Sequence, residues 1–130
     1  MKGISVYLLD AASKAQIQDE YSPQFPTFVG HHATYEFGSR DTAPLPPAGE
    51  YWVVGYSMRK ERRMNGSGIE ALVVSIDGST RRPDGGTYHI TWSYGPGYAA
   101  KDSNNIIERG YTKLNDPIKI IMTPAFLPFN

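Results

Sequence analysis

The apolar and polar positions at the start of the chain predict a strand followed by a helix. The run ISVYLL at 4–9 is mostly apolar, as a buried strand requires. Residues 10–21 then predict a helix, because Asp10 stands where an N-cap residue belongs, and Ser22 and Pro23 would stop the helix. The fold is therefore expected to open with a β-strand and an α-helix.

Most of the chain that follows consists of strand-like runs separated by turn residues. Residues 27–37 predict a second strand, and the proline-rich segment 38–49 predicts a loop within one domain. The turn sequences MNGSG and RRPDGG then separate three further expected strands, at 50–58, 68–77 and 86–94. We interpret these runs as an antiparallel meander.

The last part of the chain predicts one short helix and one strand. Asp102 or Ser103 is placed to cap a helix through NNIIER that Gly110 ends, and the final strand is expected at 117–123. The whole pattern predicts a single domain over 1–130. Its class is α+β, with few helices and a mainly antiparallel sheet or two small sheets.

Length, charge and composition narrow the range of functions. A chain of 130 residues suits one domain with a modest core. Thirteen basic residues balance thirteen acidic ones, so general attraction to duplex nucleic acid is not expected. The chain has no cysteine and three histidines, which excludes disulfides and thiolate metal sites, and we expect neither a metal nor a cofactor.

The N-terminal segment does not predict membrane insertion. Its apolar run ends at Asp10 and is too short for the core of a signal peptide or for a membrane span. We therefore expect no membrane partner, and the expected location is the cytoplasm.

The candidate chemistry lies in the segments HHATYEF and YHITWSY, both read as strands. Successive side chains of a strand point to opposite faces. The first strand is therefore expected to place His32, Thr34 and Glu36 on one face, and a largely apolar set on the other: His31, Ala33, Tyr35 and Phe37. The second strand repeats this pattern with the polar set Thr87, His89, Thr91 and Ser93, opposite the apolar set Tyr88, Ile90, Trp92 and Tyr94. Each polar face is free to line a cleft.

Two such faces suit the cleavage of an RNA-type phosphodiester without a metal. One group must remove the proton of the 2′-hydroxyl, and another must protonate the leaving oxygen. Histidine, with an unperturbed pKa of about 6.5, serves either role near neutral pH, and a threonine hydroxyl can donate to a phosphate oxygen. One His-x-Thr in a strand is an ordinary feature, whereas the pair predicts a catalytic site.

These motifs, 57 positions apart (89 minus 32), together with the opening strand and helix, resemble the 2H phosphoesterases. That family is named for two His-x-Thr or His-x-Ser motifs on a compact, bilobal and pseudo-symmetric α+β fold. The resemblance implies metal-independent hydrolysis of 2′,3′-cyclic, 2′–5′ or 3′–5′ ribonucleotide phosphodiesters. Carried over, its catalytic residues are His32, Thr34, His89 and Thr91.

The compactness of the chain is also similar to that of the phage anti-CBASS nucleases, 2H enzymes that destroy cyclic oligonucleotide messengers. The resemblance therefore implies a cyclic oligonucleotide or a short RNA as substrate, in the host cytoplasm if a phage encodes the protein. The segment between the motifs reads as a hairpin, where larger members of the family carry more helix. This difference concerns the choice of substrate more than the chemistry.

Five residues are candidates for substrate binding. Glu36 and Ser93 share the expected catalytic faces, although a strand-end carboxylate is equally expected to be simply exposed. Tyr98 and Lys101 follow the second motif in the loop GYAAKDSN, and Arg59 belongs to RKERR at a hairpin tip that solvation would also explain.

Other polar residues near the motifs have simpler explanations. His31 points away from the expected catalytic face, so it is interpreted as a buried or hydrogen-bonded structural residue. Arg81 and Arg82 occupy a turn, where exposure to water explains them.

Two alternatives to an enzyme are left open at this point. The first is a sponge of the same fold that binds a nucleotide without turnover, and the second is a structural domain with coincidental motifs. Binding alone does not require two titratable groups at matched positions, which favours catalysis over the sponge. The bases, the linkage and the oligomeric state are not given by the sequence.

Overall fold

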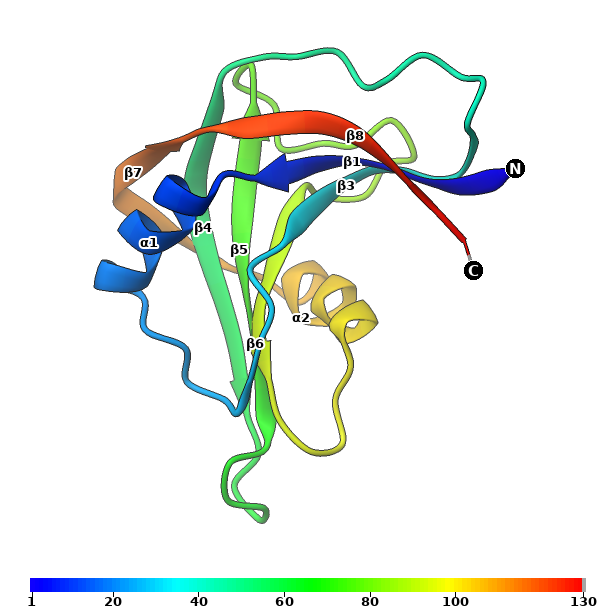
Figure 1. Cartoon of the computed structure of the whole chain (residues 1–130). Helices are drawn as coiled ribbons and strands as arrows, with labels where there is room; N and C mark the ends of the chain where they lie inside the picture. The colour runs from blue at the N-terminus through cyan, green and yellow to red at the C-terminus, as the bar shows by residue number, and fades with distance from the viewer. Residues whose placement is uncertain (130) are drawn as a thin grey trace.

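An antiparallel sheet dominates the computed structural model, which describes residues 1–129 (Figure 1). The strands are β1 (Lys2–Leu9), β2 (Thr27–Phe28), β3 (His32–Arg40), β4 (Tyr51–Lys60), β5 (Gly68–Ile76), β6 (His89–Tyr94), β7 (Thr112–Ile120) and β8 (Met122–Pro128). The helices are α1 (Ala11–Glu20), the 3₁₀ turn η1 (Ala100–Asp102) and α2 (Ser103–Glu108). The predicted α+β class, mainly antiparallel with few helices, is confirmed for the described residues.

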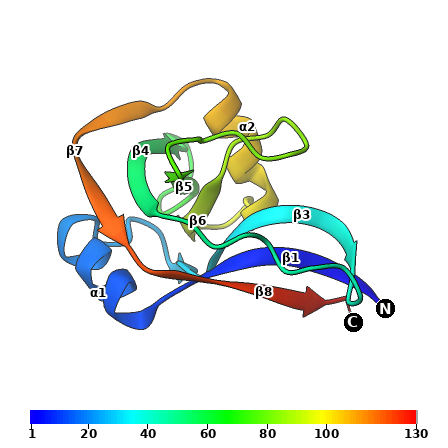
Figure 2. The ribbon, with the colours of Figure 1, turned by 90° about the horizontal axis from the view of Figure 1, so that it is seen from above.

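The strands form one curled sheet in the order β7-β4-β5-β6-β3-β1-β8, with β2 beside β6. Every strand pairing in residues 1–129 is antiparallel. The strands β7 and β8 lie at opposite edges of the sheet, yet only Ile121 separates them in the chain. The two edges therefore meet at one end, which gives the sheet the shape of a half-barrel (Figure 2).

This sheet is nearly divided between β3 and β6. Whereas β4 and β5 pair along almost their whole length, β3 and β6 are joined only by the pair Ala33 and Ile90. The sheet thus consists of a β3 half (β1, β3 and β8) and a β6 half (β2, β4, β5, β6 and β7). Beyond their single pair the two strands separate.

Two predicted strand boundaries are wrong. Residues 27–37 do not form one strand, because Gly30, with φ of 51°, turns the chain between β2 and β3. Residues 117–123 do not form one strand either. The chain leaves β4 at Ile120 and joins β1 at Met122, so the curl of the sheet gives two strands where the sequence reads as one.

Two apolar clusters pack on opposite faces of β5, which is buried along its whole length. Leu72 and Val74 belong to the larger cluster, to which α1 contributes Ile17. The opposite face packs against α2 in a smaller cluster: Ile69, Ala71, Val73, Ile106 and Ile107. The two helices therefore cover opposite sides of the central strands (Figure 1).

The start of the first helix is as predicted, since the carboxylate of Asp10 accepts from the backbone N–H groups of Ala12 and Ser13.

In the part of the chain from 1 to 129, no helix is both long enough and apolar enough to cross a membrane.

Candidate active site

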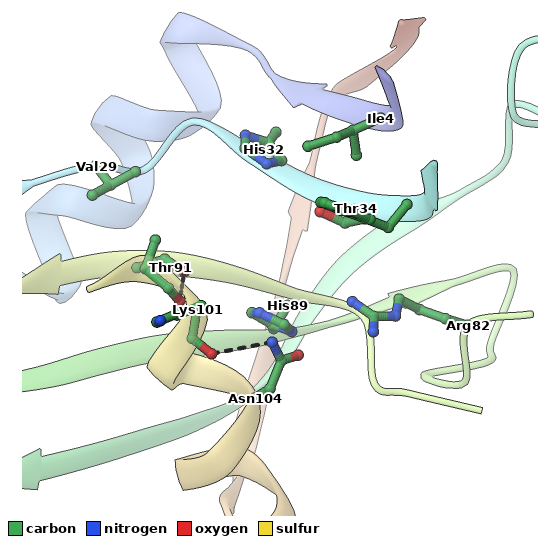
Figure 3. A pocket seen from close by; sticks show the side chains of 11 residues that line it. Ile4, Val29, His32, Thr34, Arg82, His89, Thr91, Lys101 and Asn104 are labelled. Atoms are coloured by element: carbon green, nitrogen blue, oxygen red, sulfur yellow. Dashed lines mark hydrogen bonds between the residues drawn. The ribbon is translucent and has the colours of Figure 1, made fainter. Parts of the chain in front are cut away.

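A cavity of about 340 Å³ lies where β3 and β6 separate. His32 and Thr34 line it from β3, and His89 and Thr91 line it from the facing strand β6 (Figure 3). The other lining residues are Ile4, Val29, Phe37, Arg82, Ala100, Lys101 and Asn104. Both motifs, although distant in sequence, therefore open into one cavity.

A β-bulge in β3 follows the first motif directly. Val6 of β1 pairs with Thr34, but the preceding Ser5 pairs with Glu36, so Tyr35 is the extra residue of the bulge. Residues that pair across neighbouring strands point to the same face of the sheet, whereas consecutive residues of β1 point to opposite faces. The prediction that Glu36 shares the face of Thr34 is therefore wrong. Glu36 is exposed outside the cavity, where its carboxylate accepts from the hydroxyl of Ser39 at 2.9 Å.

The same bulge moves Phe37 onto the motif face. Phe37 pairs with Ile4, and Ile4 lies two residues from Val6, which pairs with Thr34. Phe37 was expected on the opposite, apolar face. It lines the cavity instead, because a bulge shifts the alternation of every residue after it.

A matching bulge in β6 follows the second motif. Ala71 of β5 pairs with Thr91, but the preceding Glu70 pairs with Ser93, so Trp92 is the extra residue. Ser93 is consequently turned into the core, where it is fully buried and donates to the carboxylate of Glu70. The prediction that Ser93 faces the site is wrong for the same reason as for Glu36. Each motif thus carries its bulge at the residue after the threonine.

The backbone fixes the tautomer of His89. Its Nδ1 lies 2.9 Å from the carbonyl oxygen of Thr87, which can only accept, so Nδ1 carries a proton and Nε2 is the nitrogen that titrates. Burial lowers the pKa of His89, the bond to Thr87 opposes that change, and the positive charge of Arg82 adds to it. His89 is therefore held with Nε2 available to a ligand.

His32 is held by another imidazole. Its Nδ1 lies 2.9 Å from Nδ1 of His31, so one ring donates and the other accepts. Burial, reinforced by charge on His31 and on His89, lowers the pKa of His32 to about 4. His31 is exposed rather than buried, and its ring contacts His32 directly.

A buried hydroxyl, Ser103, holds Thr91. The two hydroxyl oxygens are 2.8 Å apart, and that of Thr91 also lies 3.2 Å from the carbonyl oxygen of Ala100 (Figure 3 marks a bond of Thr91). The carbonyl can only accept, so the single proton of Thr91 is directed to Ala100 and Ser103 donates to Thr91. A ligand oxygen in the cavity would compete with that carbonyl for the proton of Thr91. The sequence marked Ser103 only as a helix cap, because no pattern links the first residue of α2 to a strand twelve positions earlier.

The charged side chains of the cavity lining are cationic. Arg82 and Lys101 line the cavity, and no Asp or Glu is among the lining residues that the structure describes. The side chain of Arg82 is only 14% exposed and is held by Asp84 through two bonds of 3.1 Å. The explanation of Arg82 as a solvated turn residue is therefore wrong. The turn folds back over β6 and carries the guanidinium to the cavity.

The remaining substrate-binding candidates divide between two places. Lys101 lines the cavity as predicted, whereas Tyr98 and Arg59 line a separate hollow near α2. The hydroxyl of Tyr98 donates to the carboxylate of Glu61 at 3.2 Å. The structure therefore does not bring Tyr98 and Arg59 together with the paired histidines.

Comparison of the chain with known proteins found no match. No family model, no curated protein and no solved structure matches the chain. Within residues 1–129, no three His, Cys, Asp or Glu side chains are grouped so that they could hold a metal ion. The side chains of the cavity supply imidazoles, hydroxyls and cations.

Proposed function

We propose that this protein is a phosphodiesterase of the 2H type that cleaves ribonucleotide phosphodiester bonds by acid–base catalysis without a metal. One observation carries the proposal: both His-x-Thr pairs line a single cavity that also contains Arg82 and Lys101. The matched bulges after the two threonines add support, because they give both motifs the same local geometry, as a pseudo-symmetric site requires.

In the proposed reaction the two histidines act in opposite protonation states. The neutral imidazole takes the proton of the ribose 2′-hydroxyl, and the 2′-oxygen attacks phosphorus. The protonated imidazole gives its proton to the 5′-oxygen as the bond from phosphorus to that oxygen breaks, which yields a 2′,3′-cyclic phosphate. Hydrolysis of this product by water requires the same two groups with their roles exchanged.

The other lining residues bind the phosphate. The hydroxyls of Thr34 and Thr91 donate to the non-bridging oxygens, on which charge grows in the transition state. For Thr91 this means that its proton turns from the carbonyl of Ala100 to the phosphate when substrate binds. Arg82 and Lys101 offset the charge of the substrate. That anion also favours the imidazolium form, so binding raises the pKa of both histidines from the lowered values of the empty cavity.

The proposed substrate is a cyclic di- or oligonucleotide, or a short RNA end with a 2′,3′-cyclic or 2′–5′ linkage. A cavity of about 340 Å³ lies at the small end of the range for small-molecule sites. It suits one nucleotide unit and its phosphate, and a duplex would not enter. Removal of a cyclic oligonucleotide messenger, as in immune evasion by a phage, is the biological role that we propose for this activity.

The test is incubation with a panel of cyclic dinucleotides, cyclic trinucleotides and 2′,3′-cyclic nucleotides in excess EDTA, with products identified by mass spectrometry. We expect cleavage of at least one substrate and no dependence on divalent ions. Loss of turnover on chelation, restored by a divalent ion, would contradict a metal-free mechanism. Tight binding of a nucleotide without turnover would favour the sponge.

Variants of the two histidines complete the test. His32→Ala and His89→Ala should each lower the rate by about a hundredfold to ten-thousandfold, because each removes one proton transfer. The double variant should lose much less than the product of the two, since the residues act as a unit. If both single variants keep near-normal turnover, catalysis by this pair is wrong.

A further inference from the structure

The imidazole of His31 lies against that of His32, just before β3 begins. The two Nδ1 atoms are 2.9 Å apart, and the ring planes are nearly perpendicular, at 87°. His32 lines the cavity (Figure 3), whereas His31 is exposed to water and is absent from the lining. His31 therefore contacts the site through its neighbour.

The backbone holds His31 in this position. Its carbonyl oxygen accepts from the N–H of Leu9 at 2.9 Å, and the N–H of the preceding Gly30 donates to the carbonyl of Thr91 at 3.0 Å. Gly30, with φ of 51°, turns the chain before the strand, so the alternation of side chains along β3 does not apply to His31. The contact between the two rings is therefore built into the connection between β2 and β3.

A hydrogen bond between two Nδ1 atoms has room for only one proton between them. If His31 donates, the proton of neutral His32 lies on Nε2, and the ring cannot take a proton from a substrate at that nitrogen. If His31 accepts, neutral His32 keeps its proton on Nδ1 and its Nε2 is bare, as a base requires. The imidazolium form of His32 carries both protons, so it also fits only an accepting partner.

We propose that His31 is a positioning residue that accepts from Nδ1 of His32 and so leaves Nε2 as the nitrogen that exchanges protons in the cavity. This inference rests on the proposed function, since both the base and the acid role of His32 need this arrangement. The carbonyl oxygen of Thr87 holds Nδ1 of His89 in the same way, at 2.9 Å. Each imidazole of the cavity is thus held by an acceptor one or two residues before it in the chain.

The bond from His32 to His31 matters most when His32 is protonated, because a hydrogen bond from a charged group is stronger than one between neutral groups. His31 is absent from the cavity lining, so it is not placed to bind the substrate itself. Its loss should therefore lower kcat and leave KM nearly unchanged.

The experiment compares His31→Leu, which removes the acceptor, with His31→Asn, whose amide oxygen replaces the acceptor near the position of Nδ1. Excess EDTA in all assays prevents a metal from binding to the two imidazoles. We expect His31→Leu to lower kcat about tenfold to a hundredfold, and His31→Asn to restore kcat to within about threefold of the wild type. The matched control is Gln18→Leu, which places a leucine at an exposed position of α1 outside the cavity lining and should leave kcat unchanged.

A double variant shows whether His31 acts through His32. Once His32→Ala has removed the imidazole that His31 holds, adding His31→Leu should lower the rate no further. A purely structural role of His31 would instead lower the rate by the same factor in both backgrounds.

Nitrogen NMR of isotope-labelled histidines tests the arrangement without turnover. At about pH 8, where imidazoles are neutral, His32 of the wild type should carry its proton on Nδ1, and His31 should carry its proton on Nε2. In His31→Leu, His32 should become a mixture of both tautomers. If the wild type cleaves nothing, the proposed function fails and these tautomers alone decide whether His31 holds His32.

Three results would overturn the positioning role. The first is a bare Nδ1 on His32 in the wild type at about pH 8. The second is that an active wild type loses no kcat in folded His31→Leu, or that His31→Asn is as slow as His31→Leu. The third is a loss of equal size on adding His31→Leu to the wild type and to His32→Ala.

Discussion

The two histidines of the cavity differ in what holds Nδ1. His89 donates to a carbonyl, which keeps a proton on Nδ1 in every state of the ring. His32 contacts an imidazole, and that partner, His31, can either donate or accept. The tautomer of His32 therefore depends on its neighbour in the chain, whereas the tautomer of His89 depends only on the backbone.

This setting predicts the dependence of activity on pH. Burial lowers the pKa of His32 to about 4 and also lowers that of His89 in the empty cavity. A base must be neutral and an acid protonated, so kcat/KM, which reports on the free enzyme, should reach its maximum below about pH 6.5. The profile of kcat should lie at higher pH, because the bound anion favours imidazolium. Initial rates across the pH range test this.

The rising and the falling part of each pH profile report pKa values of the coupled histidine pair rather than of either residue alone. A maximum of kcat/KM on the alkaline side of neutrality, or a rate independent of pH, would count against acid–base catalysis by His32 and His89.

A second prediction concerns the buried hydroxyl behind Thr91. Ser103→Ala removes the donor at 2.8 Å, so Thr91 loses the bond that holds its hydroxyl oxygen in place beside the phosphate. A hydrogen bond worth about 1 kcal/mol corresponds to a loss of about fivefold in kcat. The double variant Ser103→Ala with Thr91→Ala should be no slower than Thr91→Ala alone. Additive losses in this cycle would show that Ser103 acts independently of Thr91.

At the scale of elements, the β-bulges decide which side chains meet. The sequence predicts strands at both motifs, and simple alternation is correct as far as the threonines. One extra residue in each strand then reverses the alternation, so Glu36 and Ser93 leave the site and Phe37 enters it. A bulge arises from pairing with a neighbouring strand, and that pairing is not visible in the strand's own sequence.

For the rest of the site, too, the sequence reveals residues that carry a local signal and not those that tertiary contacts place. His32 and His89 could be found because repetition of a short motif is a local signal. Arg82, which lines the cavity, and Ser103, which contacts Thr91, could not be found, since a turn and a helix carry them and the positions of both elements depend on the whole sheet. Local sequence patterns therefore predict the helices and strands, whereas tertiary contacts decide which other residues belong to the site.

The connection before β3 gives a prediction about stability. Gly30 has φ of 51°, and a Cβ there would lie 2.9 Å from the ring of Trp92. Gly30→Ala should lower the free energy of unfolding by more than the cost of about 1 to 2 kcal/mol for the left-handed backbone. Gly38→Ala is the control, because Gly38 has φ of 83° with nothing near its Cβ. Urea unfolding that gives equal losses would refute the packing contribution.

At the scale of the whole molecule, the buried site makes stability depend on pH. The pKa of His32 is about 4 in the folded chain and about 6.5 in the unfolded chain. Between these values the unfolded chain binds a proton that the folded chain excludes, so stability falls as the pH is lowered through this window. His32→Gln removes this proton uptake and should lose less stability than the wild type between about pH 7 and pH 5.

Thermal or urea unfolding at both pH values measures the difference. An equal loss of stability in the wild type and in His32→Gln would show that His32 is not held neutral by the fold.

The narrow junction between the β3 half and the β6 half also affects motion. Backbone hydrogen bonds resist bending of a sheet, and along this line the strands share only the pair Ala33 and Ile90. The backbone therefore joins β3 to β6 at fewer positions than it joins the other neighbouring long strands of the sheet. Four connections, at 10–26, 29–31, 41–50 and 121, cross the line and limit how far the halves can rotate. We therefore expect the distance between the imidazoles of His32 and His89 to change within the limits of these connections when a ligand binds to both rings.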